Sequence, residues 1–274
     1  MEQYSNVSYE LSALLTKRYS TSFGTSVTLL EKPLRRHIAA IYGLVRVADE
    51  IVDSYRGKDK LSQLDALESE VFTAIKKGYS TNPIVHSFAV TAEAYTIDKT
   101  LITPFFASMR TDITAKTFTQ KEYNDYIHGS AEVIGLMCLK VFLEGDEKKY
   151  KKLTPGATAL GSAYQKVNFL RDIKADHDEL GRCYFPGVTF KSFSEADKRA
   201  IIVDIAKDLE FADKAIKQLP LSVRKAVRLS YRYYLELLEK LALTDASVLK
   251  ENRLRVNNAR KLWLYAQTLI GANK

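Results

Sequence analysis

The segment 165–176 (QKVNFLRDIKAD) constrains the fold more than any other part of the chain. At helical spacing Asn168, Asp172 and Asp176 fall at i, i+4 and i+8, so their side chains stack along one face. Gln165 lies one turn earlier on the same side. Two carboxylates and an amide, with no His or Cys among them, form an oxygen-only ligand set that suits a hard cation such as Mg²⁺. Acidic residues four apart on a helix are more often solvent-facing charges, so this segment alone does not establish a site.

A second segment, 42–53 (YGLVRVADEIVD), repeats the acidic spacing on another predicted helix. Asp49 and Asp53 lie at i and i+4, with Arg46 one turn before them and Tyr42 two turns before. Taken alone, this pattern is most simply an intrahelical ladder of ion pairs. The neighbouring residues are largely apolar, however, and carboxylates near the C-terminal end of a helix oppose its dipole. That cost is easier to explain if cations complete a site here.

The remainder of the sequence predicts one all-α domain spanning residues 1–274. Only 12 Gly and 6 Pro interrupt 274 residues, and no strand-like alternation, repeat or linker divides the chain. The expected helices cover residues 4–19, 33–54, 61–77, 83–97, 104–114, 119–144, 155–176, 194–219, 220–243 and 256–270.

Three features of these segments bear on packing. Leu11, Leu14 and Leu15 form the apolar side of the first, amphipathic helix. Residues 19–26 read as a loop or a helix end with spare hydrogen-bond donors, and residues 178–187 read as an exposed loop. Small residues recur on the helices around 129–138 and 156–163. They indicate close helix packing, which we favour, or room for a large apolar ligand.

Composition limits the classes of function. Two distant Cys residues argue against a disulfide scaffold or a zinc site and fit a reducing compartment. The net charge of +8 suits a polyanionic substrate, an anionic membrane surface, or solubility alone. Lys and Arg are spread along the chain, so we expect no nucleic-acid partner. The N-terminus has no signal-peptide pattern, and the apolar window 133–143 is too short to span a bilayer. We therefore expect a cytoplasmic protein, at most peripheral to the inner face of a membrane.

The two acidic helices together suggest a chemistry. Facing each other across a bundle, they could hold Mg²⁺ between them, with diphosphate oxygens as the remaining ligands. The metal would stabilise diphosphate as a leaving group, and Arg or Lys at the rim could clamp it. The sequence shows no arrangement for a nucleophilic Ser or Cys, and its four His residues have no metal-ligand spacing.

Four segments in order give the chain a resemblance to the phytoene and squalene synthase family, the head-to-head trans-isoprenyl diphosphate synthases, over nearly its full length. They are residues 19–23 (YSTSF), 42–53, 161–176 (GSAYQKVNFLRDIKAD) and 181–186 (GRCYFP). The resemblance implies an isoprenoid-synthase helical bundle with a central apolar cavity and Mg²⁺ at its mouth.

The resemblance also implies roles for individual residues. The expected ligands of Mg²⁺-diphosphate are Asp49, Asp53, Asn168, Asp172 and Asp176. The four aspartates, with Tyr42 and Arg46, are the expected catalytic residues. Substrate contacts are expected from Ser20, Thr21, Ser22, Phe23, Tyr42, Arg46, Gln165, Asn168, Arg171, Arg182 and Tyr184.

The implied reaction joins two geranylgeranyl diphosphates through a cyclopropyl diphosphate to phytoene, in carotenoid biosynthesis. It would use Mg²⁺, with Mn²⁺ as a substitute, and we expect no NADPH and no obligate protein partner. Two alternatives stay open. The same chemistry on farnesyl diphosphate would give dehydrosqualene, presqualene diphosphate or squalene, and a non-catalytic member of the family would act as an assembly or binding protein. The length of the substrate tail depends on the cavity floor, which the sequence does not show.

The chain departs from the family pattern at two places. The middle helix reads SAEVIG at 130–135, where the family often has VAGxVG, so Glu132 replaces a small residue. An aromatic residue often found after the penultimate helix is not evident near 245–247. Arg253, Arg255 and Lys261 do fit the family's basic C-terminal end.

Overall fold

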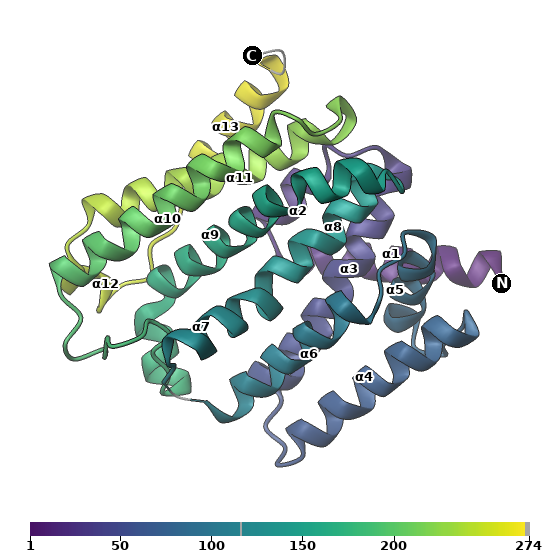
Figure 1. The fold of residues 1–274 in the computed structure, drawn as a ribbon, viewed down its shortest axis with the longest axis horizontal. Coiled ribbons are helices and arrows are strands. Elements are labelled where there is room, and N and C mark those ends of the chain that lie inside the picture. The colour runs from purple at the N-terminus through teal and green to yellow at the C-terminus, as the bar shows by residue number, and fades with distance from the viewer. Residues whose placement is uncertain (116, 272–274) are drawn as a thin grey trace.

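Every named element of the computed structural model is a helix, as the sequence predicts (Figure 1). The structure describes residues 1–115 and 117–271, so the predicted domain 1–274 includes four residues outside it. The helices are α1 (Glu2–Tyr19), α2 (Ser22–Val27), α3 (Lys32–Asp49), α4 (Lys60–Lys77), α5 (Pro83–Ala94), α6 (Lys99–Thr114), α7 (Gln120–Ile127), α8 (Val133–Leu143), α9 (Glu147–Leu180), α10 (Glu195–Ile216), α11 (Leu221–Leu243), α12 (Ala246–Leu249) and α13 (Asn258–Ile270), with π-helical turns η1 (Glu50–Ser54) and η2 (His128–Glu132).

Helix α9, 34 residues long, is the central element of the bundle. It packs against α8, α10, α11 and η2, and Figure 1 shows it running diagonally between α10 and the α7–α8 pair. One hydrophobic core extends from Val27 at the end of α2 to Val256 before α13. The two acidic motifs therefore belong to helices that share a single core.

Two helices begin earlier than the sequence suggested, because an aspartate rather than a proline marks each start. The side chain of Asp98 accepts a hydrogen bond of 2.8 Å from a backbone N–H of α6. Asp146 does the same for α9, at 2.9 Å. Such N-caps satisfy donors that a helix start leaves free. Pro104 and Pro155, which we expected at the first turns, lie inside the helices.

Several other predicted boundaries hold, but α9 continues to Leu180 beyond its predicted end at 176, α5 ends at Ala94 before 97, and α12 was not predicted. The capping box of Thr119 and Glu122 is present, and Gly78 ends α4 with a left-handed φ of 67°. Residues 22–27 form a helix rather than a loop. The predicted helices 33–54 and 119–144 each contain a π-helical turn, η1 and η2, a distortion found most often at functional sites.

Glycines allow the helices around η2 to approach closely. A Cβ on Gly129 would lie 2.1 Å from the carbonyl oxygen of Pro104, and one on Gly161 would lie 2.9 Å from that of Ala131. Both distances are shorter than van der Waals contact. Close helix packing, the interpretation favoured from sequence, is confirmed at these positions.

Helix α1 is reversed relative to its predicted orientation. Leu11 and Leu14 are exposed, whereas Ser8, Ser12 and Thr16 are buried. The hydroxyl side of the helix faces α3 and α5, where the Oγ atoms of Ser12 and Ser87 are 2.8 Å apart. Small hydroxyl side chains let this helix lie close to its neighbours, so hydrogen bonds rather than leucines fix its inner face. The prediction of a leucine-lined inner side is wrong.

Residues Gln120–Leu143 form the one described helical stretch that is long and apolar enough to cross a membrane. Half of its most apolar window is buried within the bundle. Its second part, α8, packs against α3, α6 and α9. This stretch accordingly serves as a core helix of the fold.

The approach of η2 to α6 yields a stability prediction. Gly129→Ala should lower the free energy of unfolding by about 1–3 kcal/mol, because the new methyl group meets backbone that must shift. Gly24→Ala is the matched control, since its Cβ would meet only the Thr16 carbonyl oxygen at 3.5 Å. Urea unfolding measures both. Equal stability of the two variants would contradict the tight contact.

Candidate functional site

An apolar cavity of about 350 Å³ lies at the centre of the bundle. Side chains of α2, α3, α8, α9, α10 and α11 form its wall, among them Ile41, Ile134, Leu160 and Val227. The small residues of η2, α8 and α9 also line it. The expected central cavity is confirmed, and the small residues serve close packing and the cavity at once.

The first acidic motif lies where α3 passes into η1. Asp49 is the last residue of α3, and Asp53 belongs to the π-helical turn. Their side chains are 34% and 48% exposed. Arg46 pairs chiefly with Glu50 and lies 3.8 Å from Asp49. The expected ion-pair ladder therefore exists, but Arg46 pairs mainly with the Glu50 carboxylate. Arg46 thus offsets less of the negative charge of Asp49 and Asp53.

Asp49 carries a strongly perturbed carboxyl group. Although a third of its side chain is accessible, the surrounding protein removes enough water to raise its pKa to about 7. Arg46 opposes this shift, and repulsion from Asp53, Asp112 and Glu50 adds to it. Desolvation likewise raises the pKa of Asp53. Neither aspartate lines the cavity, although Tyr42 on the same helix does.

The second acidic motif lies on the last turns of α9. Arg171 holds Asp172 through contacts of 2.8 and 2.5 Å, and Arg253 reaches the same carboxylate with its Nε at 2.7 Å from Oδ1. Arg253 comes from the irregular segment before α13. Asn168, one turn before, accepts a hydrogen bond of 3.4 Å from the hydroxyl of Tyr234. Tertiary contacts therefore bring a C-terminal arginine to this motif.

The pKa of Asp176 responds to charges from both motifs. Burial raises its pKa to about 7, and the charge of Asp172 raises it further. Arg182 opposes the shift, while Asp112 and Asp53 also raise the pKa. Repulsion of this kind requires that α9 and η1 present their carboxylates to a common space.

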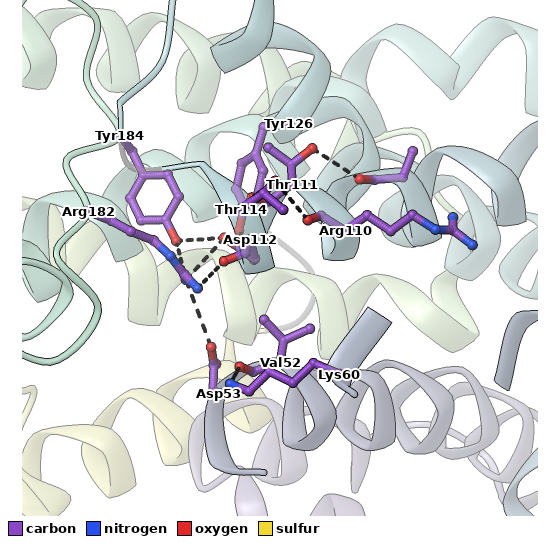
Figure 2. A network of polar contacts seen from close by, with 11 residues as sticks. Val52, Asp53, Lys60, Arg110, Thr111, Asp112, Thr114, Tyr126, Arg182 and Tyr184 are labelled. Atoms are coloured by element: carbon purple, nitrogen blue, oxygen red, sulfur yellow. Dashed lines mark hydrogen bonds and ion pairs between the residues drawn. The ribbon is translucent and has the colours of Figure 1, made fainter. Parts of the chain in front are cut away.

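A polar network around the buried Asp112 reaches Asp53 of the first motif through Arg182 (Figure 2). Asp112 on α6 accepts hydrogen bonds from Tyr126 at 2.6 Å and from Tyr184 at 2.9 Å. The Arg182 guanidinium lies 3.2 Å from the Asp112 carboxylate and 3.9 Å from that of Asp53, and Figure 2 shows it between them. Burial raises the pKa of Asp112 to about 6 against the opposing effects of Arg182 and the two hydroxyl groups.

This network corrects one prediction. Arg182 and Tyr184 were expected in an exposed loop, but their exposed fractions are 7% and 6%. The Arg182 guanidinium also donates to the Asp112 backbone carbonyl, so the loop is tied into the core. Asp112 was not among the predicted site residues. Its position could have suggested burial, because Phe105 and Met109, on the preceding turns of the same helix, are apolar and buried.

The hydroxyl-rich segment forms one wall of the cavity. Ser20 and Phe23 line the cavity, and the Ser20 Oγ accepts a hydrogen bond of 3.2 Å from the Phe23 N–H. Thr21 is exposed, and its Oγ1 lies 3.1 Å from the Lys261 ammonium. Ser22 is partly buried in the first turn of α2. These residues lie near the acidic motifs because α2 packs against α3 and α11.

Two pairs of stacked aromatic side chains contribute to the lining of the cavity. Phe23 and Tyr42 stack with ring centroids 5.3 Å apart. Tyr164 and Tyr234 stack at 3.7 Å and 12°, and all four residues line the cavity. The Tyr164–Tyr234 pair was not predicted, because its residues are 70 positions apart and only the contact of α9 with α11 joins them. Gln165, adjacent in sequence, is partly buried but is not among the lining residues.

Glu132, which departs from the family pattern, does not line the cavity. Its carboxylate lies 2.9 Å from Nδ1 of His128, and burial raises its pKa while His128 opposes the shift. The charges of Lys166 on α9 and Asp208 on α10 also affect the pKa of Glu132, so its carboxyl group lies near these two helices. The larger side chain is accommodated because it points away from the cavity.

The acidic residues offer only oxygen donors, which fits a hard divalent cation. Burial, with some repulsion from neighbouring carboxylates, raises the pKa of Asp49 and Asp176, and a bound cation would offset the cost of ionising them. Among the described residues, no three His, Cys, Asp or Glu side chains lie close enough together to hold a metal by themselves. A cation here would need further oxygen ligands, such as those of a bound diphosphate.

Comparison with known proteins finds relatives of this chain. The sequence model of the family described as squalene/phytoene synthase matches residues 16–260. A phytoene synthase of Arthrospira platensis is 29% identical over 69% of this chain and 65% of its own length. A 15-cis-phytoene synthase of Synechococcus elongatus is 27% identical over 93% of this chain and 90% of its own length.

A solved structure is similar over the whole fold. The crystal structure of a dehydrosqualene synthase in complex with ligand superposes with a TM-score of 0.81 at 20% sequence identity. The match covers 98% of both chains. At this identity the likeness establishes the helical fold, and the chemistry of the site has to be argued from its own residues.

The Asp112–Arg182 pair leads to a second stability prediction. Asp112→Asn should cost up to about 3–5 kcal/mol of unfolding free energy, because the buried Arg182 would lose its nearest charge partner and keep only Asp53 at 3.9 Å. Asp65→Asn, which removes an exposed partner of Arg110, should cost at most about 1 kcal/mol. Chemical denaturation compares the two. A loss at Asp112 no larger than that at Asp65 would show that the pair is not structural.

Proposed function

The chain belongs to the squalene/phytoene synthase family, whose members are prenyltransferases, and we propose that it joins two isoprenyl diphosphates head to head. One observation carries the proposal. The two acidic motifs adjoin an apolar cavity whose lining includes Tyr42, on the helix of the first motif, and Tyr234, which bonds Asn168 of the second. Burial raises the pKa of Asp49 and of Asp176 to about 7, and the charge of Asp53 adds to the shift of Asp176. A substrate with a diphosphate head, divalent cations and an apolar tail matches the charge at the mouth and the wall below it.

In this proposal Asp49, Asp53, Asp172 and Asp176, with Asn168, hold Mg²⁺ or Mn²⁺ together with the diphosphate. The bound cation would supply charge neutralisation that makes diphosphate a better leaving group. Arginine side chains at the same mouth would bind diphosphate oxygens directly. Arg46, Arg171 and Arg253 are placed for this role, and each now lies against a carboxylate.

The residues below the mouth would position the reacting carbons and exclude water. Phe23 and Tyr42 on one side, and Tyr164 and Tyr234 on the other, present stacked rings to the cavity. Aromatic faces attract cationic charge, so they suit an allylic cation formed after loss of diphosphate. The double bond of the second substrate would capture that cation to give the cyclopropyl diphosphate.

We further propose C20 substrates and phytoene as the product. Relatives named phytoene synthases support this assignment, with the relative from Synechococcus matched over most of both chains. On α9 the cavity wall runs from Leu153 to Tyr164, a length of about 16 Å at the helical rise. The alternative is the same chemistry on C15 substrates, supported by the structural likeness to a dehydrosqualene synthase. NADPH is not expected to be required for phytoene formation.

Location is part of the same proposal. Substrates with long apolar tails and a hydrocarbon product partition into membranes, so we propose a cytoplasmic protein in peripheral contact with a membrane. The net charge of +8 would favour an anionic surface.

The decisive experiment is incubation with radiolabelled C20 and C15 diphosphates and Mg²⁺, with and without NADPH. We expect phytoene from the C20 substrate without NADPH. Chelation of the metal should stop the reaction. Formation of a C30 product alone would establish the farnesyl alternative, and the absence of any hydrocarbon or cyclopropyl diphosphate would refute the enzymatic proposal.

Single substitutions test the acidic motifs. Asp49→Ala and Asp172→Ala should each reduce turnover by about a hundredfold or more, because the charge that holds the diphosphate cation cluster is lost. Helical circular dichroism should stay unchanged. Asp125→Ala, at a surface pair with Lys121, is the control and should retain activity. Near wild-type turnover in either motif variant would show that the assigned ligands are wrong.

A further inference from the structure

Two irregular segments contact the last turns of α9. One is the segment 181–194 between α9 and α10, and the other is the segment 250–257 between α12 and α13. The first is anchored in the hydrophobic core by Phe193, and the second by Leu249, just before it, and Val256. The contacts made between these anchors determine which side chains reach the second acidic motif.

The segment 250–257 brings Arg253 to that motif. The guanidinium makes two contacts with Asp172, with Nε 2.7 Å from Oδ1 and Nη2 3.1 Å from Oδ2. Such a bidentate pair fixes the orientation of both groups. The Arg253 side chain is nevertheless 47% exposed, so little surrounding protein holds it in place. Its position therefore depends on how the backbone of the segment is held.

Phe190, in the other segment, packs on the end of α9. Its ring stacks on that of His177, with the centroids 4.1 Å apart and the planes 13° apart. His177 directly follows Asp176 in the sequence, so the stacked rings lie beside the second acidic motif. This contact fixes the middle of the segment 181–194 against α9.

Lys250 joins the two segments. Its ammonium donates a hydrogen bond of 3.2 Å to the backbone carbonyl of Lys191 and lies 5.4 Å from the ring centroid of Phe190. A cation over an aromatic face is attracted by the charge distribution of the ring. Lys250 is three residues before Arg253, and its backbone N–H bonds to the Ala246 carbonyl at 3.3 Å at the end of α12. The start of the segment that carries Arg253 is therefore held, through Phe190, at the end of α9.

We propose that Lys250 and Phe190 are positioning residues that hold Arg253 at the second acidic motif, where it binds diphosphate. This inference rests on the proposed function. In that function Asp172 and Arg253 both act on a cluster of cation and diphosphate, so Arg253 exchanges the carboxylate for phosphate oxygens when the cluster binds. Because Lys250 holds the backbone, the exchange needs movement of the side chain alone, and less conformational entropy is lost on binding.

A positive charge near the site would also attract diphosphate from a distance, without any contact to the segment. The two roles differ in what they require. Long-range attraction depends on charge alone and weakens as salt is added. Positioning depends on the contacts of Lys250 and acts only through Arg253.

Binding of inorganic pyrophosphate with Mg²⁺, measured by titration calorimetry, tests the inference without turnover. Lys250→Met removes the ammonium and should weaken binding by about threefold to tenfold, the loss expected for one cation–π contact and one hydrogen bond. Lys250→Arg should restore most of the affinity, because a guanidinium can make both contacts. Phe190→Leu removes only the ring and should weaken binding by about twofold to fivefold.

A double-mutant cycle shows whether Lys250 acts through Arg253. Arg253→Gln alone should weaken pyrophosphate binding by about tenfold or more, since a charge-assisted contact is lost. In that background Lys250→Met should add less than about a twofold loss, because no arginine is left to position. Thermal melting of each variant checks that the fold is intact.

Lys174→Met is the matched control. Lys174 lies between Asp172 and Asp176 in the sequence of α9, and its ammonium pairs with Asp178. The substitution removes the same charge from the same end of α9. Binding of pyrophosphate should stay within about twofold of wild type at physiological salt.

Wild-type affinity in Lys250→Met or in Phe190→Leu would overturn the inference, and so would Lys250→Arg binding as weakly as Lys250→Met. An equal loss in Lys174→Met would identify long-range attraction instead, and a full additional loss in the Arg253→Gln background would mean that Lys250 acts on its own. Wild-type protein that binds no pyrophosphate would overturn the inference together with the diphosphate site.

The proposed reaction can fail separately. Wild-type protein that binds pyrophosphate, with the expected pattern among the variants, but forms no product from isoprenyl diphosphates would refute the reaction. The positioning role of Lys250 and Phe190 would stand in that case, because calorimetry measures it without turnover.

Discussion

Arg182 is the cation on which the arrangement of the acidic residues depends. Its guanidinium lies 3.2 Å from Asp112 on α6 and 3.9 Å from Asp53 in η1, and it opposes the raised pKa of Asp176 on α9. One buried positive charge thus lies within 4 Å of carboxylates from two elements and acts electrostatically on a third. It offsets part of the negative charge that the fold gathers here.

This excess charge affects stability. A carboxyl group whose pKa is higher in the folded protein binds more protons there than in the unfolded chain. For Asp49 and Asp176 this holds between the ordinary value of 3.8 and about 7, so their contribution to stability falls as the pH rises through that range. The packed helices hold the carboxylates in place despite this cost. Such a local conflict between stability and charge is typical of a functional site.

Polar and apolar residues occupy different parts of this bundle. Carboxylates and arginines gather at the C-terminal ends of α3 and α9, and the wall below them is apolar. Four stacked aromatic rings lie among the lining residues. The arrangement suits a substrate with a charged head and an apolar tail.

Features that depend on residues near one another in the chain were predictable from the sequence. Helical periodicity gave the all-α class, Thr119 with Glu122 gave a capping box, and the i, i+4 spacing gave the two acidic faces. Which helix faces meet depends on contacts between residues far apart in the chain. Asp112 and Arg182 are 70 positions apart, and Arg253 and Asp172 are 81 apart, so no local pattern could pair them. Periodicity also misjudged α1, because it shows that leucines share a side but not that hydroxyl groups on the other side find closer partners in α5.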